Sequence, residues 1–188
     1  MRLYLIAILL LLQCLSQSKA SPIYLVTLSD SEFKGKLQIS YSLLPNKILW
    51  QVDLSSLSTD NATLDVKFGS PLQFMDSFEL SLRHSEVSIQ DKYMPSVFAR
   101  GSRADQIGNY QNLLVKHSSS HSACTITFER LLDTDDLKHD LPLHKYQELI
   151  FIISLSVPDH DQKMKKTISH VLGDNADTQS LEHSDNTN

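Results

Sequence analysis

Alternation of apolar and polar side chains is the feature that most constrains the fold of this chain of 188 residues. In a β-strand successive side chains point to opposite faces, so a period of two indicates a strand with one buried face. Turn signals such as Pro45-Asn46 and Gly69-Ser70-Pro71 separate the alternating segments. Short strands divided by such turns are typical of an all-β sandwich. The expected strands are residues 37–43, 48–52, 64–68, 78–82, 87–89, 110–115 and 124–128.

The pattern therefore predicts an all-β fold, an immunoglobulin-like antiparallel β-sandwich, because no segment sustains a helical period. Residues 149–155 form a continuous apolar run, and we expect a strand that is buried on both faces. The run is too short to span a bilayer, which needs about 20 apolar residues. Lys and Arg number 17 against 22 Asp and Glu. The chain lacks the basic excess that nucleic acid or an anionic membrane surface requires.

The two ends of the chain differ in composition from its middle. Arg2 precedes an apolar run over residues 3–12, and Ser18-Lys19-Ala20 supplies the small residues that a signal peptidase reads. We predict that residues 1–20 are a signal peptide, which places the mature chain outside the cell or in the lumen of a secretory vesicle. Residues 173–188 are polar and lack aromatic residues, which predicts a disordered tail. The folded domain would then comprise residues 21–172.

Cysteine usage predicts a domain that is stabilised by its apolar core. Cys14 would leave with the signal peptide, so Cys124 would have no partner for an internal disulfide. We expect Cys124 to be a buried thiol in a strand, with an exposed thiol that pairs with another chain as the alternative. Asn61-Ala62-Thr63 is an acceptor sequence for N-glycosylation in a secreted chain.

The histidines do not predict a transition-metal site within this domain. His117 and His121 have the spacing of a helix face, but they lie in a serine-rich stretch between two expected strands. His139 and His144 flank Leu141-Pro142, where no regular element fixes their geometry. We expect the acidic residues 133–136 to form a solvated loop. No glycine-rich phosphate loop or nucleophile elbow is present in the sequence.

Eight short motifs follow one another along most of the chain. They are residues 27–33, 39–52, 68–76, 87–93, 106–114, 126–136, 149–153 and 159–169. Their order and spacing, from residue 28 to residue 172, resemble the DOMON domain. The chain is most similar to the N-terminal DOMON domain of the copper type II, ascorbate-dependent monooxygenases, the dopamine beta-monooxygenase-like family.

The resemblance implies a binding module that catalyses nothing by itself. The enzymes of this family carry copper modules after the DOMON domain, and this sequence ends where those modules would begin, so we expect no copper in this chain. They also place a cysteine where Thr134-Asp135-Asp136 stands here. We expect a secreted stand-alone domain that binds a protein or a small-molecule ligand, with copper monooxygenase modules among the conceivable partners. The alternatives are a truncated product of a monooxygenase gene and a haem-binding electron-transfer domain.

The resemblance also implies two sites. In cytochrome-type DOMON domains a Met and a His hold haem, and the matching positions are Met75 and His160. The alternative is that Met75 fills a core gap and His160 lies in a loop, and we favour it over haem. A cation site in the monooxygenase DOMON corresponds to Asp76, Ser77, Lys92 and Asn109, and it would hold Ca²⁺ or an alkali cation. The alternative is that Asp76 only caps a turn, and we favour it over a bound cation.

Overall fold

The computed structural model describes residues 22–30, 35–55, 61–70, 74–83, 86–95, 102–105, 107–117, 123–136, 139–157 and 162–173. The expected signal peptide, residues 1–20, lies outside these residues, as does the expected tail beyond Gly173. The described chain forms β1 (Ile23–Asp30), β2 (Gly35–Leu43), β3 (Lys47–Ser55), β4 (Asn61–Gly69), β5 (Met75–Arg83), β6 (Glu86–Met94), β7 (Arg103–Ala104), β8 (Tyr110–His117), β9 (Ala123–Leu131), β10 (Glu148–Val157) and β11 (Gln162–Val171).

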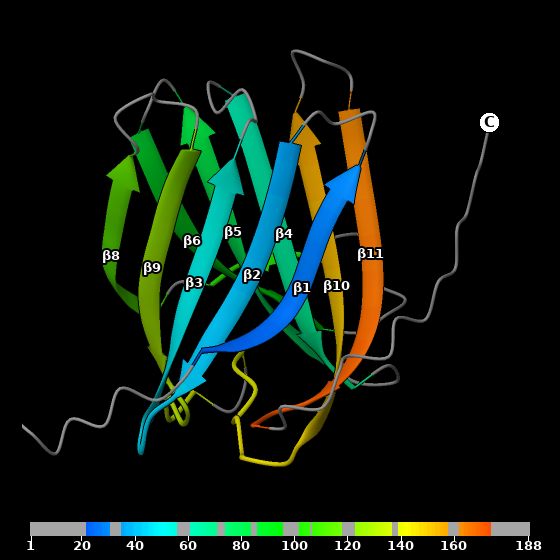
Figure 1. Cartoon of the computed structure of the whole chain (residues 1–188). Coiled ribbons are helices and arrows are strands. Elements are labelled where there is room, and N and C mark those ends of the chain that lie inside the picture. The colour runs from blue at the N-terminus through cyan, green and yellow to red at the C-terminus, as the bar shows by residue number, and fades with distance from the viewer. Residues whose placement is uncertain are drawn as a thin grey trace, which may run out of the picture.

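The strands form two antiparallel sheets that pack face to face (Figure 1). The five-stranded sheet has the order β1-β2-β3-β9-β8, and the six-stranded sheet has the order β11-β10-β4-β5-β6-β7. The predicted all-β sandwich is confirmed. The alternation analysis did not find the edge strands β1 and β11, whose polar and apolar residues do not alternate strictly.

Aromatic side chains fill the centre of the sandwich. Trp50 on β3 is fully buried, and its ring centroid lies 5.4 Å from that of Phe78 and 6.0 Å from that of Phe68. Phe128 on β9 meets Phe78 edge to face at 4.9 Å. These rings come from both sheets, and aromatic pairs in such geometry stabilise a core beyond the area that they bury. Buried and half-buried residues alternate along all of β3, along β4 up to Phe68 and along β9 up to Arg130.

Two predictions about buried residues have different outcomes. Cys124 is 3% exposed on β9, which confirms the buried thiol, and burial raises the pKa of this thiol. The prediction that residues 149–155 are buried on both faces is wrong. Phe151 and Ile153 face the core, whereas Ile150 and Ile152 are only half-buried. The reason is that only one face of β10 packs against the opposite sheet. The other face is shielded only partly, by side chains of the neighbouring strands β4 and β11.

The connection between β9 and β10 runs across one end of the sandwich, the lower end in Figure 1. Backbone hydrogen bonds tie this connection to the strands that end there. The Leu143 N–H donates to Leu132 O at 2.7 Å, and the Leu132 N–H donates to Asn46 O at 3.0 Å. We call this the polar end, because it carries the buried charges described below.

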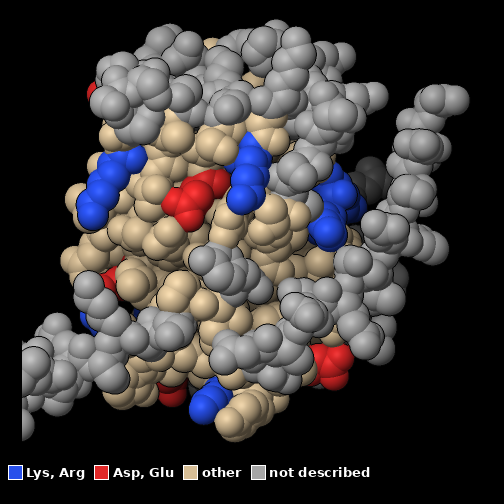
Figure 2. Space-filling view, in the orientation of Figure 1, with Lys and Arg blue, Asp and Glu red and all other residues tan. Residues whose placement is uncertain are grey.

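The outer face of the five-stranded sheet carries charges of both signs (Figure 2). On it Asp53 accepts hydrogen bonds from Thr125 Oγ1 at 2.6 Å and from Gln51 Nε2 at 2.7 Å. Lys47 Nζ lies 2.8 Å from Glu129 Oε2. Within the described ranges, no helix has the length and apolar character needed to cross a membrane.

Candidate functional site

Three carboxylates and one guanidinium are buried together at the polar end. Asp76 comes from β5, Asp91 from β6, Arg130 from β9 and Asp140 from the connection between β9 and β10. Their exposed fractions are 0%, 6%, 1% and 3%. One carboxylate oxygen from each aspartate lies within 4.8 Å of those of the other two. We call Asp76, Asp91 and Asp140 the buried triad.

Arg130 pairs mainly with Asp76. Its Nη2 donates to Asp76 Oδ2 and, at 3.0 Å, to Leu141 O, while Asp140 Oδ1 lies 3.7 Å away. The Leu141 N–H also donates to Asp76 Oδ2 at 3.0 Å. The guanidinium carbon lies 5.9 Å from the centroid of the Phe68 ring, where the apolar core begins. Arg130 therefore pairs closely with Asp76 and more distantly with Asp140, while Asp91 has no ion pair among the described residues.

Asp91 and Asp140 are held by neutral donors. The Asn109 N–H donates to Asp91 Oδ2 at 2.7 Å, and Asn109 Nδ2 donates to Asp140 Oδ2 at 2.5 Å. Thr134 Oγ1 donates to the same oxygen of Asp140. In each residue of the triad the Oδ1 atom is buried and has no hydrogen-bond partner among the described residues. Buried polar atoms are seldom left unpaired, so these three oxygens are available to a cation or to ordered water.

The electrostatics of the triad agree with this interpretation. Burial raises the pKa of Asp91 to about 6 and also raises the pKa of Asp140, against the effect of their hydrogen bonds. Burial likewise raises the pKa of Asp76, although Arg130 opposes this. Removing charge from water costs several kcal/mol per ion unless a partner compensates it. Without a bound cation, the aspartates of the triad therefore release their protons at a higher pH than solvent-exposed aspartates do.

The structure brings two of the four predicted cation-site residues to the triad. Asp76 is a member, in a strand rather than at the cap of a turn, and Asn109 donates to the other two members. Ser77 Oγ donates to Lys92 O at 3.1 Å, and Lys92 Nζ pairs with Glu79 at 2.5 Å. Ser77 and Lys92 were expected to offer their backbone carbonyls rather than their side chains, and these two side chains lie on the face of the sheet opposite Asp76.

The other predicted sites lie elsewhere. Met75 is 1% exposed and is adjacent to Asp76 on β5, so it belongs to the face opposite the buried triad. His160, the other expected haem ligand, lies outside the described residues. Asn61 is half-buried at the start of β4 and pairs with Arg83, at the far end of the sandwich from the triad.

Sequence reasoning did not assign Asp91, Arg130 or Asp140 to a site. Asp91 and Arg130 stand within motifs that carry the resemblance, and they occupy positions in strands where a period of two expects a core residue. A charged residue at a position expected to face the core could have indicated a buried polar site. Asp140 lies outside any strand, and nothing in its local sequence indicates burial.

A groove lies at the polar end, lined in part by the residues that directly follow Arg130. It has a volume of about 850 Å³ and is lined by apolar and polar side chains. The lining includes Leu43, Leu131, Leu132, Leu143, Asp133 and Lys145. No protein-family model matches this chain, and no curated protein does. The interpretation of the groove and the triad therefore depends on their own chemistry.

Proposed function

We propose that this chain is a secreted, non-catalytic binding module of the DOMON type, whose polar end is fixed by a Ca²⁺ ion among Asp76, Asp91 and Asp140. The observation that carries the proposal is the buried triad, with one unpartnered oxygen on each carboxylate and one guanidinium for all three. The motif order given above supports the DOMON assignment.

Charge and ligand type favour calcium. Three carboxylates and one guanidinium carry a net charge of −2 when all are ionised, which a divalent ion balances and an alkali ion does not. Carboxylate and carbonyl oxygens are the ligands that Ca²⁺ prefers, at about 2.3–2.6 Å. Asn109 and Thr134 hold two of the carboxylates by their Oδ2 atoms, which orients the groups before an ion binds.

The role of the ion would be to hold the binding surface in shape. The segment that follows Arg130 lines the groove through Leu131, Leu132 and Asp133, and its Thr134 then donates to the triad. An ion that fixes Asp140 would fix the middle of the connection between β9 and β10, and through the hydrogen bond from Thr134 it would also hold the start of that connection. Leucines in the groove suit an apolar part of a ligand, and Asp133 and Lys145 can select its polar groups.

Thermal unfolding with and without Ca²⁺ tests the proposal. We expect the chain in chelator to unfold at a lower temperature than the chain in Ca²⁺, because an ion that binds only the folded state stabilises it by about 2.7 kcal/mol at 100 times its Kd. Asp91→Asn removes a buried charge, so it should leave the chelated protein at least as stable and abolish the response to Ca²⁺.

The matched control is Asp53→Asn, which removes a carboxylate from the outer face of the five-stranded sheet. It should lower stability slightly and keep the full response to Ca²⁺. A wild-type chain whose unfolding temperature is the same in chelator, Ca²⁺ and Na⁺ would overturn the proposal. An equal response to Ca²⁺ in wild type and Asp91→Asn would also overturn it.

A further inference from the structure

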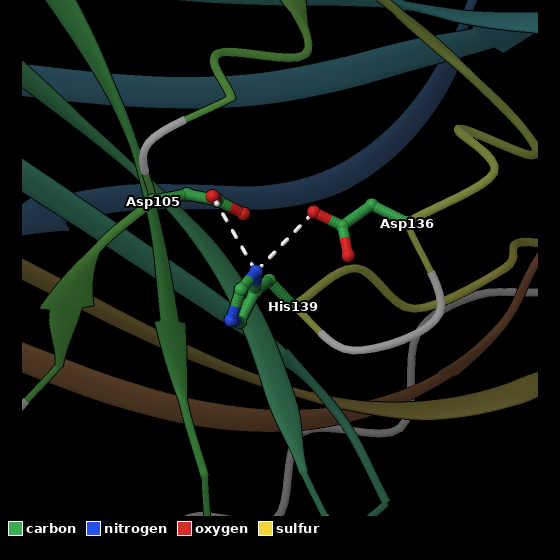
Figure 3. A group of neighbouring side chains, drawn as sticks. All are labelled: Asp105, Asp136 and His139. Carbon is green, nitrogen blue, oxygen red and sulfur yellow. Dashed lines mark hydrogen bonds and ion pairs between the residues drawn. The ribbon is translucent and has the colours of Figure 1, made fainter.

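A second group of ligand-type side chains lies at the polar end, nearer to solvent than the buried triad. Asp105 follows β7, and Asp136 and His139 belong to the connection between β9 and β10. Figure 3 shows the two carboxylates and the imidazole directed toward a common space. His139 Nδ1 lies 3.2 Å from Asp136 Oδ2 and 3.6 Å from Asp105 Oδ1. We call these three residues the outer cluster.

Asp105 supplies an oxygen that lacks a partner. Its side chain is 1% exposed although it belongs to a loop. Oδ1 accepts a hydrogen bond from the Ile107 N–H at 3.0 Å, whereas Oδ2 is buried and has no hydrogen-bond partner within the described ranges. Such an atom is costly unless a ligand satisfies it. In Figure 3 this carboxylate faces Asp136 and the ring of His139.

The imidazole is held in place from two sides. Its ring packs on Tyr93 with a centroid separation of 4.5 Å, and Tyr93 in turn stacks on Phe74 at 5.9 Å. The His139 N–H donates to Asp136 O at 3.2 Å, which fixes the backbone next to the ring. A metal ligand needs this kind of support to keep its orientation. The Nδ1 atom therefore faces the two carboxylates before any ion is bound.

The distances suit a single small ion. Zinc bonds of about 2.0–2.1 Å place neighbouring ligand atoms of a tetrahedron about 3.3 Å apart. The two observed separations from Nδ1 lie close to this value. A hollow of about 480 Å³, which the outer cluster lines together with Thr134 and Ile107, gives the ion a path from solvent. It also leaves room for water or a ligand atom at a fourth position.

We propose that Asp105, Asp136 and His139 bind a divalent transition-metal ion, with Zn²⁺ as the best match. The imidazole sets this site apart from the all-oxygen triad, because a nitrogen ligand favours Zn²⁺ and similar ions over Ca²⁺. The ion would link the segment after β7 to the connection between β9 and β10. The site goes beyond the proposed function and does not require calcium in the triad. The competing arrangement is a protonated His139 that pairs with both carboxylates and takes no metal.

Calorimetric titration of the full secreted chain with Zn²⁺, in excess Ca²⁺, tests the site. We expect saturable binding of one ion per chain. His139→Gln should weaken binding by more than the roughly 10–100-fold that loss of an outer-shell partner costs. His144→Gln removes an exposed histidine from the same connection and should leave binding unchanged. Co²⁺ in place of Zn²⁺ should give visible absorption that His139→Gln abolishes.

Thermal unfolding of each variant shows that it is folded, and Asp136→Asn provides a second test should His139→Gln fail to fold. Absence of saturable Zn²⁺ binding would overturn the site, as would equal affinity in wild type and His139→Gln. Asp91→Asn should keep its affinity for Zn²⁺. Failure of the calcium site and failure of the zinc site are therefore distinguishable.

Discussion

The centre of the sandwich and its polar end are built by the same strands but bury opposite kinds of side chain. On β5, Phe78 faces the core, and Asp76 occupies the next inward position toward the end. On β9, Ile126 and Phe128 face the core and Arg130 follows in the same register. The period of two thus decides which positions face inward, and the residue type decides what they contribute.

The two regions differ in what they do for stability. A buried apolar side chain stabilises the fold by about 1.5–3 kcal/mol. A buried ion pair is often no better than apolar residues of the same shape, yet removing one member costs about 3–5 kcal/mol. The polar end is therefore weak as a source of stability and sensitive to change, as a binding site is expected to be.

The largest effects should come from Phe128→Ala and Arg130→Met on the same strand. Phe128→Ala leaves a cavity and should lower the free energy of unfolding by about 3–5 kcal/mol. Arg130→Met leaves the buried triad without its cation and should cost a similar amount at pH 7. Urea unfolding at pH 7 and pH 5 separates the two causes. The cost of Arg130→Met should shrink at pH 5, because Asp91, whose pKa is about 6, takes up a proton and the triad then carries less negative charge. The cost of Phe128→Ala should not change.

If the losses of stability in Phe128→Ala and Arg130→Met depended equally on pH, the proposed difference between the apolar centre and the polar end would be contradicted. The double variant Asp76→Leu with Arg130→Met sharpens the comparison, because it extends the apolar core through the pair. We expect it to recover most of the stability that Arg130→Met alone loses. A double variant as unstable as Arg130→Met would show that the pair has a role that apolar packing cannot replace.

A smaller effect concerns pH in the chelated protein. Asp91 has a pKa of about 6, raised from 3.8 by burial, so between these values the folded chain binds a proton that the unfolded chain has released. Stability should therefore rise as pH falls through about 6 and level off below about 4, by at most about 3 kcal/mol. Urea unfolding from pH 4 to pH 8 measures this slope. Asp91→Asn should remove the Asp91 part of the slope and keep the part that comes from Asp76 and Asp140, whose pKa values burial also raises. An unchanged slope in that variant would assign all of it to the other groups.

The smallest effect is expected at the opposite end of the sandwich. When the chain is expressed through the secretory pathway, Asn61→Gln should remove the expected glycan, seen as a loss of the mobility shift on deglycosylation. Asn61 lies at the start of β4, away from the buried triad, so the free energy of unfolding should change by less than about 0.5 kcal/mol. A large loss of the response to Ca²⁺ in Asn61→Gln would mean that the two ends are coupled.

The sequence predicted the sandwich because its strands alternate. Positions such as Ile48, Trp50 and Val52 on β3 have the predicted inward face. The outward side of β10 was misjudged, since a continuous apolar run does not say how much a neighbouring strand covers. Ile150 and Ile152 are half-buried for this reason.

The candidate sites were predicted less well, for a physical reason. Asp76 and Asn109 were found through the resemblance, but Asp140 joins them only because its loop folds back over β5 and β9. The outer cluster likewise brings together Asp105 and His139 from separate segments of the chain, so the spacing of residues within either segment does not predict the cluster. The part of the site that a sequence can predict is a charged residue at an inward-facing strand position, such as Arg130.

Calorimetric titration of the full chain with Ca²⁺ tests most directly whether the polar end is a cation site. We expect one ion per wild-type chain and no measurable binding to Asp91→Asn, while Asp53→Asn behaves like wild type. Absence of binding to a folded wild-type chain would contradict the calcium site and leave the triad as a protonated structural cluster.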